Sequence, residues 1–597
     1  MTARFSVGID LGTTNSVVAF TRCDDEYAET ELLQIPQVVA PGQVESREFL
    51  PSFLYLPRAG EVDSLRTPLG EDPELGIVGI YARSQAAENP QRVVAASKSW
   101  LCHGKVGRTD AVLPWQSPEE VPKVSAFDCA VRYLCHIVRS WNAAHPHDKL
   151  SNQNVVLTVP ASFDPAAREL TREAALKSGL PTDFVLLEEP QAAVYRWLGS
   201  KGDGWRSTLS PGDTLLVVDV GGGTTDLTLV GVSELAGELS LQRLAVGNHL
   251  LIGGDNMDLA LAHLVSQRLN EQGHDLDPWQ SVSLWHACRD AKELLLSDAG
   301  PETQTISVLG RGSSLIGGTI STELSKSDAQ DLILEGFFPA CSISAVPQRQ
   351  AASGFQDIGL PYESDPAITK QVAAFLTSHQ ATGTDGGHDS MPTHVLYNGG
   401  VFRSESLQRR MHETIKAWCD QEPAVLGGAQ DLNTSVAVGG AYYGWAKQQG
   451  GIRIRGGTAR SYYVGIETAG LAIPGAPRPL RALCVAARGM EEGTQVDVPG
   501  DSVGIIVGSP ARFRFFSSTA RPDDPVGKTL DRWSPQELVE SESIELSLTS
   551  DSAGDDPFVP VRFVSRVTEL GMFELWCYST RNDDQWKMEF NVRNDDT

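Results

Sequence analysis

The sequence lacks the features that mark membrane, secreted and nucleic-acid-binding proteins. No run approaches the roughly 18–20 consecutive apolar residues that a membrane-spanning helix needs. The N-terminus enters a strand pattern without a signal-type apolar segment. Basic residues are few, with 49 Lys and Arg against 76 Asp and Glu and a net charge of −27. Because nucleic acids and anionic membranes both reward clustered Lys and Arg, neither is expected as a main partner.

Cysteine is also sparse, with nine residues among 597 and no Cys-x-x-Cys pair. An odd number without paired spacing argues against a disulfide framework or a zinc ribbon. Cys135 and His136 are neighbours on a predicted helix, where adjacent side chains diverge by about 100°, so we expect no shared metal there. These absences predict reduced thiols in a cytoplasmic, monomeric protein.

The most informative stretch is 214–230, TLLVVDVGGGTTDLTLV. An apolar run ends at Asp219, three glycines follow, and a second alternating run begins after Asp226. This pattern predicts a β-hairpin whose turn is Gly221 to Gly223. A turn without side chains lets backbone N–H groups face one anion, as a phosphate cradle requires. An aspartate beside phosphate needs a cation between them, so the stretch also implies Mg²⁺.

A second hairpin of the same kind begins the chain, FSVGIDLGTTNSVVAF. Its strand ends at Asp10, which is 209 residues before Asp219, about the length of one domain. The turn that follows contains Gly12, Thr13, Thr14 and Asn15. Two such copies predict a duplicated α/β core whose hairpins face each other across a cleft and grip phosphates from two sides.

The segments between and after the hairpins alternate strand and helix patterns, which is typical of a parallel sheet. A buried strand over 154–163 precedes a helix with Asp164 as N-cap, and Glu189 follows the next strand. Gly253 and Gly254 precede a helix whose expected N-cap is Asp255, and a helix start suits an anion. Lys98, in a small and apolar setting, would by itself be interpreted as a surface lysine.

Three further segments complete the organisation. Residues 342–392 are rich in Gly, Asp and Pro, and we expect an irregular surface insertion there. Residues 448–461 form a Gly- and Arg-rich linker. From 462 to 597 short alternating runs with regular turn signals predict an antiparallel β-sandwich. No helical pattern follows them, so we expect no helical lid, either because the chain is shortened or because it is divergent.

These motifs, in this order, resemble the seventy-kilodalton heat-shock chaperones of the DnaK-like type. IDLGTTNSVVA and VVDVGGGTTDLTL resemble that family's two phosphate motifs, TVPASFDPAAR and LEEPQAA its connecting stretches, and VLYNGGVFR its adenosine-side motif. SYYVGIETAG resembles the start of its substrate-binding β-domain. The resemblance implies an actin-like ATPase domain over 1–447, with two lobes around a nucleotide cleft, followed by a substrate-binding-like β-domain.

The resemblance also implies roles for individual residues. Asp10 and Asp219 would hold Mg²⁺, largely through its water molecules. The implied catalytic residues, which order the attacking water and assist hydrolysis, are Lys98, Glu189, Asp219, Thr224 and Asp226. The implied contacts to ATP or ADP are Gly12, Thr13, Thr14, Asn15, Gly221, Gly222, Gly223, Gly253, Gly254, Lys292, Gly399, Gly400 and Arg403. Pro160, Arg168 and Glu189 match residues implicated in signalling between the family's domains.

The chain departs from the family at several of these places. Arg289 stands three residues before Lys292, where the family often has Glu, and Leu296 stands where it has a hydroxyl. Both changes affect the side of the site expected to contact ribose or adenine. The linker contains three arginines, whereas the family's linker is acidic and rich in leucine.

The leading hypothesis is an ATP-hydrolysing chaperone that binds exposed apolar segments of polypeptide clients, with a J-domain protein and a nucleotide-exchange factor as partners. The main alternative is a nucleotide-binding co-chaperone or scaffold with little or no hydrolysis, which the altered linker and β-domain favour. A small-molecule kinase on the same core is a third possibility, against which the β-sandwich and the TVPASF and EEP stretches argue.

Overall fold

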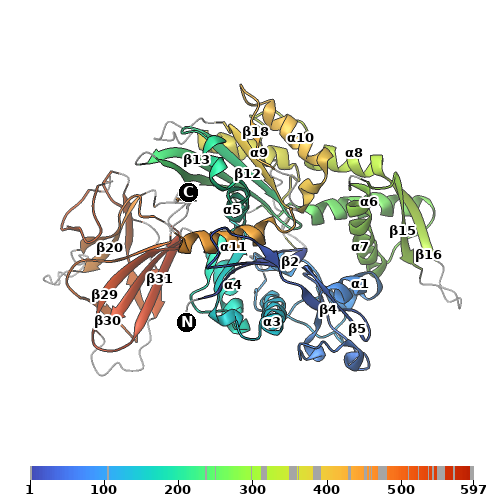
Figure 1. The fold of residues 1–597 in the computed structure, drawn as a ribbon, viewed down its shortest axis with the longest axis horizontal. Helices are drawn as coiled ribbons and strands as arrows, with labels where there is room; N and C mark the ends of the chain where they lie inside the picture. Colours follow the sequence, from blue (N-terminus) through green and yellow to red (C-terminus); the bar gives the residue numbers. More distant parts are fainter. Residues whose placement is uncertain are drawn as a thin grey trace, which may run out of the picture. The chain divides into compact units, whose positions relative to one another are not determined.

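The computed structural model describes most of the chain, which divides into two compact units, Met1–Arg453 and Ile454–Thr597 (Figure 1). The described residues are 3–103, 106–235, 238–248, 250–297, 299–310, 319–348, 360, 362–380, 391–427, 432–449, 454–455, 458, 460–467, 480–491, 493–508, 510–518, 520–521, 523–534, 537–540, 544–547, 558–568 and 572–591. The mixed α/β character expected from the sequence is confirmed. None of the helices in these ranges is both long and apolar enough for a membrane span.

The first sheet of the first unit is built around the N-terminal hairpin. Its strand order is β11-β10-β1-β2-β3, and β6 (Phe49–Pro51) also pairs with β2. β1 is antiparallel to β2 and parallel to β10. The strands are β1 (Phe5–Leu11), β2 (Asn15–Arg22), β3 (Glu31–Leu32), β10 (Asn154–Val159) and β11 (Val185–Glu188).

A second sheet repeats this order around the second hairpin, β18-β17-β12-β13-β14. β12 is antiparallel to β13 and parallel to β17, so the two predicted hairpins are confirmed. The strands are β12 (Thr214–Val220), β13 (Thr225–Leu235), β14 (Glu238–Val246), β17 (His394–Asn398) and β18 (Ala424–Val425). Asp10 and Asp219 each lie one residue before the end of the equivalent central strand.

Helix α11 (Ser435–Gln448) packs on the first sheet with almost no space between the backbones. A Cβ atom on Gly8 of β1 would lie 2.1 Å from the Ala437 carbonyl oxygen. A Cβ atom on Gly439 would lie 1.8 Å from the Ala192 carbonyl oxygen in α5 (Glu189–Lys201). Figure 1 shows α11 between α5 and β2. Glycine is therefore required wherever these backbones meet.

The second half of the unit has a core that the second sheet shares with a group of helices. α6 (Gly254–Glu271) and α7 (Pro278–Leu295) pack together with α8 (Lys326–Phe337), the hairpin of β15 (Thr303–Leu309) and β16 (Thr319–Ser325), and α10 (Glu405–Lys416). Asp277 caps α7 with its side chain and shares a capping box with Gln280. This capping fixes the start of the helix that carries Arg289 and Lys292.

The expectation of an irregular surface insertion over 342–392 is wrong for its helix α9 (Ile368–Gln380). Ile368, Val372 and Leu376 are buried in the same core as α6 and α7. Their spacing of four residues is that of one helix face, and it buries apolar surface that an exposed loop would not. Residues 349–359, 361 and 381–390 of this segment lie outside the described residues.

The remaining elements of the first unit are short, apart from two helices. α3 (Ala126–Ala144) and α4 (Pro165–Ser178) pack together, and α4 is capped by Asp164 as predicted. The others are β4 (Ile35–Ala40), β5 (Gln43–Arg47), β7 (Leu54–Tyr55), β8 (Ile77–Val78), α1 (Ile80–Glu88), β9 (Val93–Val94) and α2 (Ser97–Trp100).

The second unit contains two antiparallel sheets that share one core. One has the order β26-β21-β20-β25-β27, and the other has β22-β29-β30-β31 with β23 also paired to β29. Tyr462 and Phe515 from the first sheet are buried with Val561, Phe573 and Leu575 from the second. The strands of these two sheets are β20 (Ser461–Glu467), β21 (Leu480–Ala486), β22 (Thr494–Asp497), β23 (Val503–Ile506), β25 (Phe515–Ser518), β26 (Thr529–Leu530), β27 (Val539–Glu540), β29 (Phe558–Val567), β30 (Met572–Ser579) and β31 (Gln585–Asn591). β24 (Pro510–Phe513) and β28 (Ile544–Ser547) form a two-stranded sheet of their own, and the unit begins with the short strand β19 (Ile454–Arg455).

Of the linker predicted over 448–461, residues 450–453, 456–457 and 459 lie outside the described residues. The boundary between the two units, after Arg453, falls within this predicted linker.

Candidate functional site

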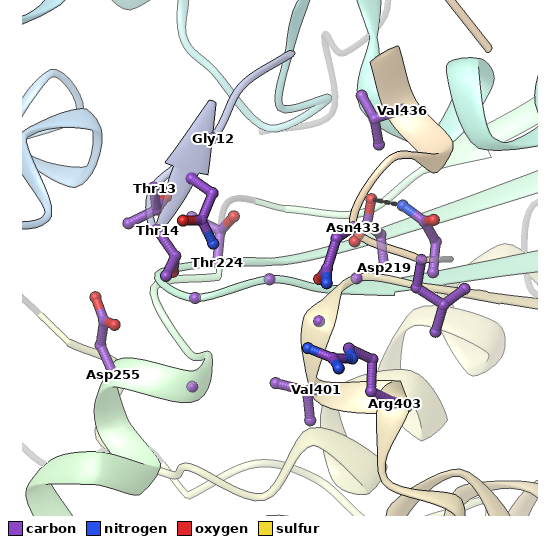
Figure 2. Close-up of a pocket in the computed structure, with 18 of the residues that line it drawn as sticks. Gly12, Thr13, Thr14, Asp219, Thr224, Asp255, Val401, Arg403, Asn433 and Val436 are labelled. Carbon is purple, nitrogen blue, oxygen red and sulfur yellow. Dashed lines mark hydrogen bonds between the residues drawn. The ribbon is translucent and has the colours of Figure 1, made fainter. Parts of the chain in front are cut away.

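A cavity in the first unit is lined by both hairpins and by the helical half of the unit. Figure 2 shows Thr13, Thr14 and Thr224 on one side of it and Val401 and Arg403 on another. The lining residues are Asp10, Gly12, Thr13, Thr14, Asn15, Lys98, Glu189, Asp219, Gly221, Gly222, Thr224, Gly254, Asp255, Asp258, Arg289, Lys292, Glu293, Asn398, Gly399, Gly400, Val401, Arg403, Leu432, Asn433 and Val436.

The turns of the two hairpins pack against each other at this cavity. A Cβ atom on Gly222 would lie 2.3 Å from the Thr14 hydroxyl, and one on Gly223 would lie 2.5 Å from the Ser99 hydroxyl. The Gly221 N–H donates to the Thr224 carbonyl over 2.9 Å, which closes the second turn. The glycines are therefore needed because hydroxyl groups from the other half of the unit occupy the space of their missing side chains.

The start of α6 is bound to the second turn. The Gly254 N–H donates to the Gly221 carbonyl over 3.0 Å, and the Asp255 N–H donates to the Gly222 carbonyl over 2.7 Å. The N-cap is Gly253, so the expectation that Asp255 caps this helix is wrong. Because these two N–H groups are used within the protein, they hold the turn in place rather than offer themselves to an anion.

Acidic side chains surround a single lysine at the base of the cavity. The Lys98 ammonium lies 2.5 Å from Glu189 Oε1, and both side chains are largely buried. Burial raises the pKa of Asp10 to about 6, of Asp219 to about 7 and of Glu189 to about 8. Burial would lower the pKa of Lys98, but the neighbouring carboxylates, Glu189 first, raise it overall. The cluster therefore has more buried carboxyl groups than one lysine can neutralise, and burial favours protonation of the remainder unless another cation is present.

This surplus of carboxylate oxygen fits a magnesium ion, since Mg²⁺ prefers oxygen ligands and keeps several of its waters. Within the described ranges no three His, Cys, Asp or Glu side chains converge closely enough to ligate one ion directly. Asp10 and Asp219 come from the two hairpins and both line the cavity. The residues present thus fit a cation held mostly through water and ligand oxygens.

Asp226 contributes to the cluster from behind. It is buried and accepts a hydrogen bond from the Ser162 N–H over 3.1 Å, but it does not line the cavity. Its charge still acts on Lys98, whose pKa it helps to raise. This contact links the TVPASF stretch to the second hairpin. In the same stretch the Arg168 guanidinium donates to the Ala161 carbonyl over 2.7 Å.

A buried ion-pair network forms the opposite side of the cavity. The Arg289 guanidinium lies 2.5 Å from Asp255 Oδ1 and 2.8 Å from Asp258 Oδ2. The Lys292 ammonium lies 2.5 Å from Asp258 Oδ1 and donates to the Gly254 carbonyl over 2.8 Å. Two aspartates on α6 thus neutralise two cations on α7. Arg289, which departs from the family pattern, is a structural cation here.

The strand β17 and the turn after it form the remaining side. Gly399 has φ of +89°, and a Cβ atom there would lie 2.2 Å from the Val220 carbonyl oxygen, so only glycine fits. Before it, the Asn398 amide donates to Asp219 Oδ2 over 2.7 Å. The dashed line at Asp219 in Figure 2 marks this bond.

Most of the predicted site residues are brought together around this cavity, whereas Gly223, Gly253 and Asp226 lie just outside its lining. Their chemical roles stay predictions. Four polar lining residues were not identified from the sequence: Asp258, Glu293, Asn398 and Asn433. Two others were named only in another role, Asp255 as a helix cap and Arg289 as a departure from the family pattern. The one available signal was an amide directly before Gly399–Gly400, at the end of an apolar strand.

The comparisons with known proteins agree on one family. The model described as "Hsp70 protein" matches residues 138–335. The chain is 25% identical over 445 residues to the "Chaperone protein HscA homolog" of Methylobacillus flagellatus, which covers 71% of this chain and 61% of that protein. It is 29% identical over 279 residues to the homolog of Acinetobacter baumannii, which covers 45% and 38%. It is 30% identical over 321 residues to "Chaperone protein HscA" of an Enterobacter species, which covers 51% and 44%.

The chain thus spans about two fifths to three fifths of the length of the curated relatives that it matches. The matched region of the family model contains β10, α4, β11, both strands of the second hairpin and the helices with the buried ion-pair network. Over residues 138–335 the chain is therefore similar to the Hsp70 family, and it is 25–30% identical to the HscA chaperones over the regions that they match.

Proposed function

We propose that this protein is an ATP-dependent molecular chaperone of the DnaK-like type, which binds and slowly hydrolyses Mg-ATP and couples this to binding of unfolded polypeptide. In this proposal residues 1–447 are an actin-like ATPase domain with two lobes around the cavity, and residues 462–597 are a substrate-binding-like domain. The observation that carries it is the meeting of two glycine turns above the acidic cluster of Asp10, Glu189 and Asp219 around Lys98. This combination suits a polyphosphate with a cation.

The proposed binding mode assigns the two halves of the cavity to the two ends of the nucleotide. Backbone N–H groups at the turns and the hydroxyls of Thr13 and Thr14 would hold phosphate oxygens, with Lys98 as the nearby positive charge. Gly399, Gly400 and Arg403 would lie along the adenosine side. Lys292 would join them, although its ammonium is already bound to Asp258 and Gly254.

Hydrolysis in this site would depend on positioning rather than on covalent chemistry. A bound magnesium would neutralise charge on the phosphate oxygens, with Asp10 and Asp219 placed to accept hydrogen bonds from its waters. Glu189 is held by Lys98 and has a raised pKa, so it is suited to orient the attacking water and accept its proton. Thr224, at the turn of the second hairpin, would assist this water.

Polypeptide binding is proposed for the second unit. Extended peptides bind such β-domains by backbone hydrogen bonds together with side-chain pockets. Ile506 and Phe558 are paired in register on β23 and β29, and both are exposed, with 37% and 53% of their surface accessible. Outward apolar side chains of this kind support contact with apolar client segments. A J-domain protein and a nucleotide-exchange factor are the proposed partners, and the cytoplasm the proposed location.

The test is single-turnover hydrolysis of ATP with Mg²⁺, with and without an unfolded peptide, in the wild type, Asp219→Asn and Lys98→Ala. Asp63→Asn and Lys201→Ala, exposed residues outside the cavity, are the matched controls. Slow hydrolysis that peptide accelerates and both cavity variants abolish supports the proposal. Tight ATP binding without turnover in the wild type would instead support the alternative, a nucleotide-binding scaffold that does not hydrolyse ATP. Hydrolysis at the same rate with and without peptide would support an ATPase but contradict coupling of hydrolysis to polypeptide binding.

A further inference from the structure

Three polar residues form one row across the second sheet. Asp219 on β12 is directly opposite Asp226 on β13 and Asn398 on β17. Residues opposite each other on neighbouring strands project from the same face of a sheet. Asn398 lines the cavity, and only 1% of its surface is accessible. Its amide therefore lies beside the Asp219 carboxylate as part of the cavity wall.

The orientation of the Asn398 amide follows from its partner. Its nitrogen donates to Asp219 Oδ2 over 2.7 Å. In the ionised form of Asp219, which is the form that would face a cation, the carboxylate only accepts hydrogen bonds and the nitrogen must face it. The amide oxygen, Oδ1, is buried and has no hydrogen-bond partner among the described residues. An unpaired buried acceptor destabilises the folded protein, because it has lost its hydrogen bond to water and gained no other. Such a cost is expected where a ligand or its water supplies the missing partner.

The other carboxylate oxygen of Asp219 is left open to the cavity. Oδ1 of Asp219 faces Gly399, where a Cβ atom would lie 2.7 Å from it. No donor among the described residues binds this oxygen, and Asp219 lines the cavity. The Asn398 amide thus holds one oxygen of the carboxylate, and the absence of a side chain at Gly399 leaves room at the other.

The first sheet has a related arrangement at the equivalent position. Thr158 on β10 is directly opposite Asp10 on β1, as Asn398 is opposite Asp219. Its buried hydroxyl donates to the Ile9 carbonyl over 3.3 Å, and beside Asp10 it works against the rise in the pKa of Asp10 caused by burial. Both central aspartates therefore have a neutral polar neighbour on the parallel strand. Only the second neighbour is an amide, whose spare oxygen can accept a hydrogen bond.

We propose that Asn398 is a positioning residue of the magnesium site: its amide nitrogen fixes Asp219 Oδ2, so that Oδ1 of Asp219 faces the water shell of the cation, and its own Oδ1 accepts a hydrogen bond from one of those waters. This inference rests on the proposed function, since it assumes Mg²⁺ bound with nucleotide. Removing a group that orients a metal-binding side chain typically lowers metal affinity 10- to 100-fold.

The test measures ADP affinity by calorimetry as a function of Mg²⁺ and in excess EDTA, on the full chain. Asn398→Leu removes both the donor and the acceptor, and Asn398→Thr restores a donor of the kind present in the first sheet. We expect the Leu variant to need about tenfold more Mg²⁺ for the same enhancement of ADP affinity. Its ADP affinity in EDTA should equal that of the wild type, and the Thr variant should recover part of the loss. Tyr397→Phe, on the same strand, is the control.

Two outcomes would overturn the inference, and they are distinguishable. If the wild type shows Mg²⁺-dependent ADP binding and Asn398→Leu retains it in full, Asn398 does not position the site and the proposed function is untouched. The same conclusion follows if the Leu variant loses ADP affinity equally in EDTA, because that is a general structural defect. If the wild type binds ADP without any dependence on Mg²⁺, the proposed metal site fails and the role of Asn398 fails with it.

Discussion

The two sheets of the first unit share a strand order but use positive charge differently. In the first half, Lys98 faces the cavity and is surrounded by more carboxylates than it can neutralise. In the second half, Arg289 and Lys292 are matched by Asp255 and Asp258 within the protein. The comparison teaches that the repeated strands place the two aspartates, while the segments inserted in each half supply the cations. One cation lies in an excess of carboxyl groups, and the other two are matched by aspartates within the protein.

The packing of the two central strands gives the largest expected difference. At the position two residues before the central aspartate the first sheet has Gly8 and the second has Val217. Gly8→Val would place atoms within 2.1 Å of the Ala437 carbonyl oxygen and 2.4 Å of the Ala441 nitrogen. Because these backbone atoms cannot move aside as a flexible side chain can, we expect the free energy of unfolding to fall by more than about 4 kcal/mol. Soluble yield and thermal unfolding would show this loss.

The matched control for this change is Gly60→Ala, where a Cβ atom would meet nothing within 4 Å. It should leave unfolding unchanged. A Gly8→Val protein that unfolds like the wild type would show that α11 does not pack on β1 as closely as the distances indicate.

The second-half network should matter mainly for stability. Arg289→Ala leaves Asp255 and Asp258 buried with Lys292 as their one remaining cation in the network. Breaking a buried ion pair by removing one partner costs about 3–5 kcal/mol. We expect a clear fall in the unfolding temperature, and partial recovery when Asp255→Asn is added. A variant that unfolds normally yet no longer binds nucleotide would assign Arg289 to the ligand instead.

The first-half lysine should show the opposite behaviour. Lys98→Ala removes the cation of the acidic cluster. If the proposed function holds, we expect turnover to fall by about 10²- to 10³-fold, as when one preorganised electrostatic group is lost. We expect a smaller change in unfolding temperature than for Arg289→Ala, because the freed carboxylates can take up protons. Single-turnover hydrolysis and thermal unfolding should be measured for both variants in parallel. The contrast between the two halves would be wrong if Lys98→Ala mainly lowered the unfolding temperature and Arg289→Ala mainly lowered turnover.

The smallest expected effect is a pH dependence of the nucleotide-free protein. The pKa values of Asp10, Glu189 and Asp219 are raised by burial from 3.8, 4.5 and 3.8 to about 6, 8 and 7. The folded state therefore binds more protons than the unfolded state between about pH 4 and 8, so stability falls as pH rises through this window. We expect the unfolding temperature to fall measurably between pH 6 and 8 without Mg²⁺.

Asp219→Asn should flatten this pH dependence, since it removes one buried carboxyl group whose pKa is raised. Thermal unfolding from pH 5.5 to 8.5 in EDTA measures it. Equal slopes for the wild type and this variant would mean that Asp219 does not change its protonation in the folded protein over this pH range.

Local patterns allowed prediction of the hairpins but not of the contacts between distant segments. The strand, aspartate and glycine order around Asp10 and Asp219 lies within a few residues, so each hairpin was predictable from a short window. Arg289 finds its partners on another helix, 31 and 34 residues earlier, and nothing in the sequence shows that pairing. Helix α9 was missed because its apolar face is short and is flanked by Gly, Asp and Pro, which dominate the composition of 342–392.

The close contact of α11 with β1 has a consequence for how the protein is made. The Ser6 hydroxyl donates to the Ala441 carbonyl over 2.8 Å, across 435 residues of chain. The strand β1 is synthesised first, but the helix α11 that packs on it is synthesised only near the end of the unit. We expect the first sheet to stay incompletely covered on the ribosome until α11 has emerged. Nascent chains stalled before residue 435 should be cleaved in β1 and β2 by a protease that spares chains stalled well beyond residue 448.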